Sequence, residues 1–402
     1  MSREPDLTAA ETAVLGFIDE AAIISLTSAL VEAPSENPGG TEEAAVEVLE
    51  SACRALGFDV VTHEVAPGRP NLVATVPAGT GAGLMFLGHS DVVPAGPGWS
   101  ADPYTVRIRD GRIYGRGATD MKGGLAAVVA AMTALRRAAE VGVELSGPVR
   151  LVCTVDEEEH GIGVRDFVGR PADLEFRGCV VAEPTDMQVV RGCRGASYIE
   201  IEVTGRAAHS GRPTDGRSAI DAAAAIVDII RADGERLAET ADDLLGHGTW
   251  NVGTITGGQG ISVVAPGCSL GIDRRLMPDE DPHRIADDLR RAISARGIDT
   301  DGISVDVRVT MEMPGFATEA THPLVTTAVG AVTDAGADTS VGGWTAACDG
   351  GFVSRDLGVP SIVLGPGNIN TDAHQPDESV AIADLVIAAR AYALAAMRLL
   401  GP

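Results

Sequence analysis

Short apolar runs alternate with helix-like patterns along the first half of the chain. We expect buried strands at 70–76, 83–88, 148–155 and 178–183, and helices at 41–56 and 123–139. Strands that alternate with helices predict an α/β fold whose mostly parallel sheet is covered by helices. In such a sheet, ligands bind beyond the carboxyl ends of the strands, so polar residues after the apolar runs are candidates for a site.

The pattern changes near residue 194. We expect, in chain order, a strand at 198–205, a helix at 217–231, strands at 250–256 and 268–274, a helix at 282–296 and a strand at 303–309. A βαββαβ order is typical of a small two-layer, ferredoxin-like domain. A strand at 360–365 and a helix at 382–400 then return to the first pattern. The sequence therefore predicts a main domain formed by 1–193 and 310–402, with an inserted domain at 194–309.

Composition narrows the class of partner. A length of 402 residues suits two domains, and a net charge of -26 argues against a nucleic acid or an anionic membrane surface. The first residues contain no basic region followed by an apolar one, so we expect no secretory signal. Six cysteines without CxxC spacing are typical of buried thiols in a reducing compartment. We expect a cytoplasmic protein with small-molecule ligands.

Five segments carry histidine, aspartate and glutamate, and four of them follow an apolar run. They are GHSDVV at 88–93, GRGATDMKGG at 115–124, DEEEHG at 156–161, AEPTD at 182–186 and TDAHQPDE at 371–378. Imidazole and carboxylate groups are metal ligands, and several such groups in order indicate a metal site more strongly than any one of them.

Two of these segments offer specific roles. His89 can bind a metal while Asp91, two residues later on the same side of an extended chain, holds the other ring nitrogen. A strand-end histidine capped by an aspartate is the alternative. Asp120 lies in a glycine-rich turn, where it can bridge two ions or simply cap the next helix. A phosphate loop is excluded because Lys122 is not followed by Ser or Thr.

The acidic run at 156–159 places like charges side by side. Such crowding costs stability unless a cation is present, although a solvated acidic turn is the alternative. Adjacent glutamates can act as general base and as ligand. With Glu183 and His374, two imidazoles and three carboxylates suit a pair of Zn²⁺ ions, for which Co²⁺ or Mn²⁺ can substitute.

The ordered motifs resemble the co-catalytic zinc metallopeptidase and deacylase family, which includes acetylornithine deacetylase, succinyl-diaminopimelate desuccinylase and glutamate carboxypeptidase. The likeness covers nearly the whole chain. It implies one zinc on His89, Asp120 and Glu183, and the other on Asp120, Glu158 and His374. It also implies Glu157 as the general base. A third glutamate, Glu159, leaves a shift of register by one residue open.

The resemblance extends to the inserted domain. Segment 205–220 resembles the family segment whose histidine stabilises the oxyanion, in dimeric members from the partner subunit, which implies this role for His209. The family's Asp-x-Arg implies that Arg275 binds a substrate carboxylate. An exposed loop histidine and a surface arginine are the alternatives. By the same likeness we expect a homodimer that forms through the inserted domain.

Two segments depart from the family pattern and affect substrate choice. Residues 262–265 read SVVA where many members have Asn-Val-Val-Pro, and residues 347–349 read ACD where several deacylases have Thr-Ser-Asp. The sequence predicts a di-zinc hydrolase that cleaves the amide bond of a small N-acyl amino acid or related amide. The alternatives are a metallocarboxypeptidase or dipeptidase and a metal-binding protein with lapsed catalysis.

Overall fold

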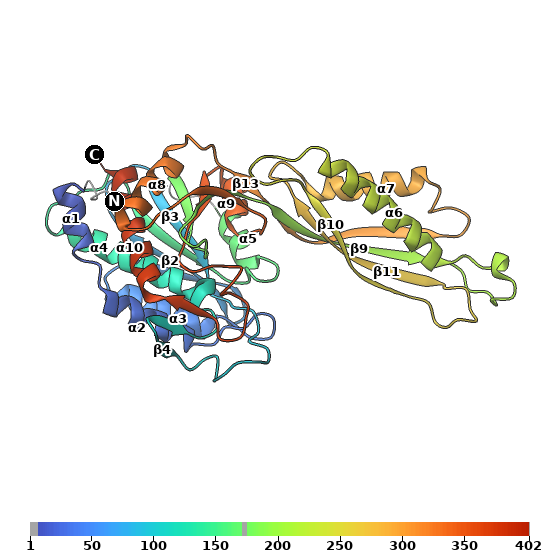
Figure 1. Cartoon of the computed structure of the whole chain (residues 1–402), viewed down its shortest axis with the longest axis horizontal. Helices are drawn as coiled ribbons and strands as arrows, with labels where there is room; N and C mark the ends of the chain where they lie inside the picture. Colours follow the sequence, from blue (N-terminus) through green and yellow to red (C-terminus); the bar gives the residue numbers. More distant parts are fainter. Residues whose placement is uncertain (1–6, 171–174, 402) are drawn as a thin grey trace. The chain divides into compact units, whose positions relative to one another are not determined.

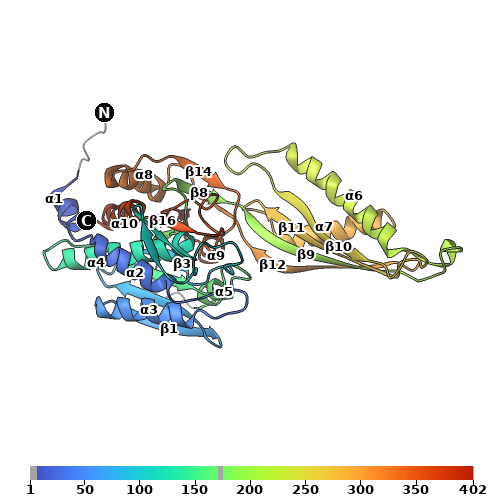
Figure 2. The ribbon, with the colours of Figure 1, turned by 60° about the horizontal axis from the view of Figure 1, so that its bottom comes forward.

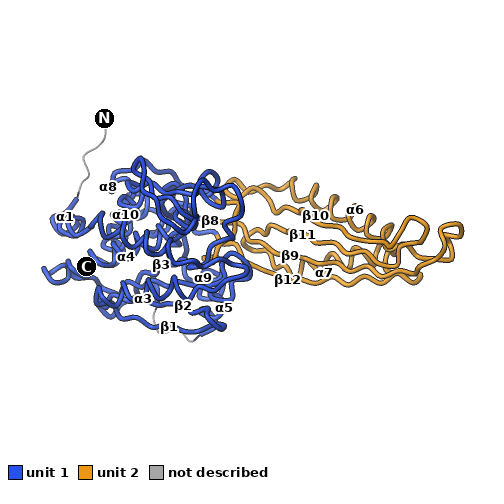
Figure 3. The backbone as a smooth tube through the Cα atoms, turned by 90° about the horizontal axis from the view of Figure 1, so that it is seen from below, with its two compact units in different colours: residues 1–192, 317–343, 352–402 blue, residues 193–316, 344–351 orange. Residues whose placement is uncertain are grey.

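The computed structural model describes residues 7–170 and 175–401, which form two compact units (Figure 3). Unit 1 comprises 1–192, 317–343 and 352–402, and unit 2 comprises 193–316 and 344–351. The expected insertion at 194–309 ends too early, because its last strand continues to Met313. The expected boundaries also lack the short segment 344–351. Hydrophobic periodicity locates strands, but it does not reveal which neighbours a distant loop packs against.

The large sheet of unit 1 has the order β1-β2-β6-β3-β7-β15-β8-β13, and β14 pairs with β8. Its strands are β1 (Asp59–Ala66), β2 (Arg69–Val76), β3 (Gly83–His89), β6 (Val149–Thr154), β7 (Phe176–Val181), β8 (Val189–Cys193), β13 (Phe316–Ala317), β14 (Val341–Trp344) and β15 (Ser361–Val363). The centre, β6-β3-β7-β15, is parallel.

The flanks of this sheet add antiparallel pairs to the expected parallel centre, so the sheet is mixed. The pairs β1–β2, β2–β6 and β8–β15 are antiparallel. A hairpin explains the first of them, because Ala66 pairs with Arg69 across a two-residue loop. Parallel pairing needs a crossover of about a dozen residues or more. The parallel centre nevertheless contains the three strands whose ends carry the predicted site.

Helices cover both faces of the large sheet (Figures 1 and 2). They are α1 (Ala9–Leu15), α2 (Glu20–Val31), α3 (Glu43–Ala55), α4 (Gly123–Ala139), α5 (Ile162–Val168), α8 (Pro323–Ala335), α9 (Gly350–Leu357) and α10 (Ile382–Leu400). On one face α8 packs against α10, α10 against α4, α4 against α2 and α2 against α3. On the other face, Val73 and Thr75 of β2 line a groove together with Phe167 of α5.

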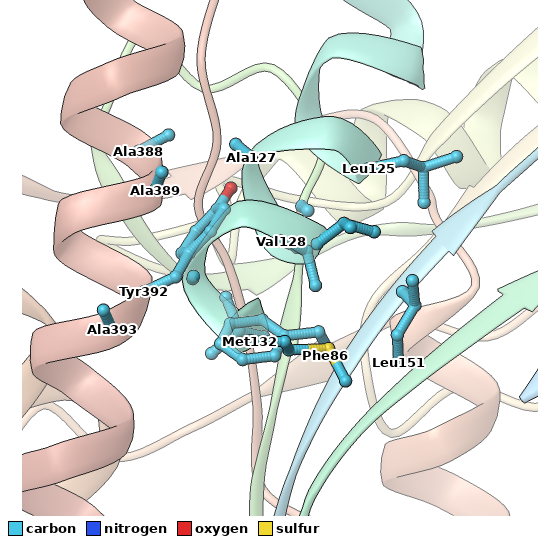
Figure 4. Close-up of a cluster of buried hydrophobic side chains, with 14 of the residues drawn as sticks. Phe86, Leu125, Ala127, Val128, Met132, Leu151, Ala388, Ala389, Tyr392 and Ala393 are labelled. Atoms are coloured by element: carbon cyan, nitrogen blue, oxygen red, sulfur yellow. The ribbon is translucent and has the colours of Figure 1, made fainter. Parts of the chain in front are cut away.

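The main core lies between the sheet and the helix layer that contains α4 and α10. Figure 4 shows Tyr392 of α10 among buried side chains of α4 such as Ala127 and Val128, and its ring centroid lies 5.2 Å from that of Phe86 on β3. The Tyr392 hydroxyl donates to the Leu364 carbonyl at 2.7 Å, so the buried polar atom has a partner. This core fixes the strand ends that carry the site.

Local sequence signals explain where several helices begin. The Asp19 side chain accepts hydrogen bonds from the amides of Ala21 and Ala22 at the start of α2. Pro323 occupies the first turn of α8, where its missing N–H costs nothing. Helix α4 has no side-chain cap and follows directly from the turn 118–122. The N-cap position of α4 is Lys122, so Asp120, which lies two residues earlier in that turn, does not cap the helix.

Unit 2 has the predicted βαββαβ order. Its elements are β9 (Gly195–Thr204), α6 (Ala219–Ala238), β10 (Thr249–Gly257), β11 (Gly267–Leu276), α7 (Pro282–Ala295) and β12 (Ser304–Met313). The antiparallel sheet has the order β10-β11-β9-β12. Alternate residues of β9, such as Ile199 and Ile201, pack under α6 and α7. Helix α6 continues past the expected end at 231 because the apolar stripe stops before the helix does.

A small sheet joins two distant parts of unit 1. It contains β4 (Arg107–Arg109), β5 (Arg112–Tyr114) and β16 (Ser379–Ala381) in the order β16-β5-β4. The described part of the chain has no single helix that is long and apolar enough to cross a membrane. Within the described residues, only the bent pair of α1 and α2 has, when taken together, the length and composition of a membrane-crossing segment.

Candidate metal centre

Three of the predicted segments meet at one edge of the parallel centre of the sheet. His89 ends β3, the acidic turn follows β6, and Glu183 follows β7. Because β3 pairs in parallel with both β6 and β7, the carboxyl ends of the three strands point the same way. The turn before α4 adds Asp120, and the segment before β16 adds His374.

The side chains form two groups that share one carboxylate. Nε2 of His89 lies 3.2 Å from Oδ1 of Asp120 and 3.1 Å from Oε1 of Glu183. Nε2 of His374 lies 3.0 Å from Oδ2 of Asp120 and 3.2 Å from Oε1 of Glu158. Asp120 therefore offers one oxygen to each group, as a bridging ligand requires.

The geometry and chemistry of these groups fit a pair of divalent metal ions. In a tetrahedral zinc site with bonds of about 2.0 Å, neighbouring ligand atoms lie about 3.3 Å apart. The four nitrogen–oxygen distances of 3.0–3.2 Å are close to that value. Imidazole nitrogen and carboxylate oxygen are suitable donors, and His89, Asp120 and Glu183 are buried. Buried carboxylates without a cation would be costly, which favours metal binding.

Proton affinities in the metal-free cluster reflect the crowding of these groups. Burial, together with the nearby charge of Asp120, raises the pKa of Glu183 to about 8. Hydrogen bonds to Asp120 and Glu158 raise the pKa of His374 to about 10. Burial acts to raise the pKa of Asp120, but its bonds with His374 and His89 outweigh burial and lower it. Protons thus occupy the cluster near neutral pH, in the positions where a cation would replace them.

Asp91 does not hold the His89 ring in the way that the sequence predicted. Nδ1 of His89 lies 2.9 Å from the backbone carbonyl of Asp91 and 3.6 Å from its carboxylate. The carboxylate instead accepts the amides of Glu157 at 3.2 Å and Glu158 at 3.1 Å. The backbone carbonyl of Asp91 thus holds Nδ1 of His89, so that Nε2 faces the site. The carboxylate of Asp91 holds the acidic turn in place.

The acidic turn separates its three glutamates. Glu158 faces His374, and a carboxylate oxygen of Glu157 lies within 4.8 Å of ligand atoms of His89 and Glu183. Glu159 lies away from this cluster, with 37% of its side chain exposed and Oε2 3.8 Å from Nδ1 of His160. The geometry thus favours the register in which Glu157 and Glu158, rather than Glu159, belong to the site.

A buried hydrogen-bond network that the sequence did not predict lies behind the acidic turn. The side-chain amide of Asn37 donates to Asp91 at 3.0 Å and to Asp156 at 2.9 Å. Arg69 donates to the same oxygen of Asp156 at 2.9 Å and also pairs with the buried Glu42. Asn37 and Arg69 lie far from the motifs in sequence, and only the Asn-Pro-Gly-Gly turn at 37–40 hinted at a special backbone.

The glycine-rich segment allows close packing beside Asp120. Gly117 has φ 82°, and a Cβ atom there would lie 2.5 Å from Val92 Cγ1. At Gly124, the second residue of α4, a Cβ atom would lie 2.2 Å from the carbonyl oxygen of Ala182. Helix α4 can therefore approach the end of β7 next to Glu183.

The predicted substrate-binding residues lie in unit 2. His209 is exposed, and its Nδ1 accepts the amide of Gly211 at 3.0 Å. Segment 262–265 runs beside it, because His209 and Val263 form a β-bridge. Nε and Nη2 of Arg275 donate to the two carboxylate oxygens of Asp273 at 3.1 and 3.0 Å. The other altered segment, 347–349, also belongs to unit 2.

Comparison with known proteins identifies the family. The model of peptidase family M20/M25/M40 matches residues 85–398, which include all five motif segments. The chain belongs to this family. The acetylornithine deacetylase of Vibrio vulnificus is 31% identical over 89% of this chain and 92% of that protein, and the acetylornithine deacetylase of Vibrio campbellii is 30% identical over 89% and 91%. As a member of this family, the protein is a metal-dependent amidohydrolase.

The fold is also that of solved members of the M20 family. The aminopeptidase PepT of Bacillus cereus superposes with a TM-score of 0.77 at 22% identity, covering 96% of this chain and 100% of that one. Similarity at this level supports the shared α/β architecture around a large central sheet.

Proposed function

We propose that this M20 enzyme removes the acyl group from a small N-acyl amino acid, using two Zn²⁺ ions that Co²⁺ or Mn²⁺ can replace. The observation that carries the proposal is the sharing of Asp120 between His89 and His374, with Glu183 and Glu158 on either side. This arrangement provides three ligands for each ion.

Each residue of unit 1 has a distinct task in the proposed reaction. His89, Asp120 and Glu183 hold one ion, and Asp120, Glu158 and His374 hold the other. The bound cations supply Lewis acidity and lower the pKa of a water molecule. Glu157 takes a proton from that water and delivers it to the leaving amine. Asp91 keeps Glu157 and Glu158 in register through their backbone amides.

Two residues of unit 2 complete the proposal. Because Nδ1 of His209 accepts a hydrogen bond from Gly211, the neutral ring carries its proton on Nε2. That N–H can donate to the oxyanion of the transition state. Asp273 holds Nε and Nη2 of Arg275, so we assign Nη1 of Arg275 to the substrate carboxylate. By family likeness we propose a homodimer formed through unit 2, in which the partner subunit supplies the histidine.

The similar proteins favour deacylation over peptide cleavage. The Vibrio relatives are named acetylornithine deacetylases and match nearly their whole length. We therefore propose an N-acetyl amino acid with a second amine as the first substrate to test. We also propose a cytoplasmic location, which is supported by six buried cysteines with free thiols.

A substrate panel tests this proposal. Metal-free enzyme is reconstituted with Zn²⁺ or Co²⁺ and assayed with N-acetyl, N-succinyl and N-formyl amino acids and with dipeptides. We expect the highest kcat/KM with an N-acyl amino acid. Preferred cleavage of dipeptides would overturn the deacylase assignment, and lack of turnover on every substrate despite bound metal would support lapsed catalysis. Light scattering on the same preparation measures the mass and tests the dimer.

A further inference from the structure

A pair of short strands brings two distant metal-ligand segments together. Ser379 of β16 pairs with Tyr114 of β5 in antiparallel register. Asp120 lies six residues after Tyr114, and His374 lies five residues before Ser379. Because the chains run in opposite directions, the two segments leave the strand pair side by side, and both ligands reach the same place.

Glu378, the residue before β16, ties these segments to each other. Its Oε1 accepts the backbone amides of Thr119 at 2.9 Å and of Asp120 itself at 3.0 Å. Its Oε2 accepts from Nη1 of Arg116 at 2.5 Å. Only 2% of Glu378 is exposed. A single buried carboxylate on the His374 segment therefore holds the backbone of the shared ligand, Asp120.

The surroundings of Glu378 keep its carboxylate in one orientation. The guanidinium of Arg116 lies over the Trp99 ring, 5.2 Å from its centroid. The amide of Gly115 donates to the carbonyl of Glu378 at 3.0 Å, and the Thr119 hydroxyl donates to the Ser379 carbonyl at 2.8 Å. Backbone and side-chain bonds thus fix Glu378 from both sides, as expected of a residue whose position matters.

The neighbouring acidic residue provides a natural contrast. Asp377 accepts from Ser100 and Arg107, and 38% of its side chain is exposed. It holds the same segment to a surface loop. Asp377 contacts neither Asp120 nor His374 through these bonds, so a change there alters the loop without removing a support of a metal ligand.

We propose that Glu378 is a positioning residue of the metal centre, which sets the distance between Asp120 and His374 by holding the amide of Asp120. This inference rests on the metal-ligand roles proposed above. Residues that orient metal ligands from behind typically change metal affinity by about 10–100-fold when they are replaced. We expect an effect of this size, with a changed coordination geometry, although Glu378 does not touch the metal ions.

The test must separate the amide bonds from the buried ion pair. Removing Glu378 alone would leave Arg116 buried and unpaired and could unfold the chain. We therefore compare two double variants, R116M/E378Q and R116M/E378M. Neither has the buried pair, and Gln and Met have nearly the same shape. Only Gln retains an oxygen that can accept the amides of Thr119 and Asp120. D377N serves as the control on the same segment.

Cobalt provides readouts that do not depend on activity. Each metal-free variant is titrated with Co²⁺ against a chromogenic chelator, its visible d–d spectrum is recorded, and its folding is checked by thermal melting. For one or both Co²⁺ ions, we expect the dissociation constant of R116M/E378M to be about tenfold or more above that of R116M/E378Q. The d–d spectrum of R116M/E378M should also differ. D377N should match the wild type.

The possible outcomes distinguish this inference from the proposed function. Equal Co²⁺ affinities and identical spectra in the two folded double variants would overturn the role of Glu378 and leave the metal centre intact. If R116M/E378M does not fold but R116M/E378Q does, R116M/E378L, which also lacks the accepting oxygen, takes its place and must bind Co²⁺ more weakly than R116M/E378Q, or the inference is wrong. Absence of Co²⁺ binding by the wild type would instead refute the proposed metal ligands.

Discussion

Oδ2 of Asp120 lies 3.0 Å from Nε2 of His374, although 254 positions separate the two residues in the chain. Its other oxygen, Oδ1, lies 3.2 Å from His89. One carboxylate thus connects two groups of ligands, and His374 reaches its group from a distant part of the chain.

Replacing Glu157 with Gln should reduce kcat by at least about 100-fold while metal content stays the same. Proton transfer by a positioned side chain contributes about 10²–10⁴-fold to rates, and an amide cannot take up the proton. Turnover and metal content are measured on the same preparation. Glu159→Gln is the matched control, because Glu159 lies in the same turn but away from the ligands. Near-normal turnover in Glu157→Gln would show that another group is the base.

Replacing His374 with Ala should leave about one strongly bound metal ion per chain, since His89, Asp120 and Glu183 stay in place. Elemental analysis after dialysis against trace zinc measures the stoichiometry. His160→Ala, which removes an exposed histidine next to the acidic turn, should retain two ions. Two tightly bound ions in His374→Ala would contradict the assigned ligand set.

Metal binding should release protons, and metal affinity should fall as the pH falls. In the metal-free chain, Asp120 and Glu158 raise the pKa of His374 to about 10, and burial raises that of Glu183 to about 8. Both groups therefore hold a proton at pH 7, and a cation must displace it. Calorimetry in buffers with different ionisation enthalpies counts the released protons. Binding heats that do not vary with the buffer would contradict this prediction.

Replacing Asn37 with Asp should destabilise the fold by at least about 3 kcal/mol, because it removes two donors and places a third carboxylate against Asp91 and Asp156. The loss should shrink as the pH falls, because protonation removes the added charge. Urea denaturation gives the free energy of unfolding. Gln259→Glu makes the same amide-to-acid change on an exposed loop and should alter stability by no more than about 0.5 kcal/mol.

Much of the site could be predicted because its ligands follow strands. His89, the acidic turn and Glu183 each come directly after an apolar run, and parallel neighbours bring such ends together. The role of the Asp91 carboxylate was not predictable. Asp91 lies two residues after His89, so its carboxylate can reach either the His89 ring or the amides of Glu157 and Glu158. Only the path of the acidic turn decides between these partners.

Two features could not be predicted because they depend on long-range pairing. They are the strand direction at the flanks of the sheet and the buried residues that support the site. The partners of Asn37, Arg69 and Glu378 were not predictable from the sequence, because they lie 27 to 262 positions away in the chain. A polar residue in an irregular segment looks the same in sequence whether it faces water or a buried amide. Its burial is known only after the segments around it have folded.

By itself, the sequence determined the types of donor, their order along the chain and the alternation of strands and helices, because side-chain chemistry and hydrophobic period are local properties. The tertiary structure alone decided which oxygen of Asp120 faces which histidine, that Glu158 rather than Glu159 joins His374, and that Glu378 supports the shared ligand. Distances of about 3 Å between residues from distant segments arise only when the sheet, the glycine-rich turn and the β5–β16 pair have formed together.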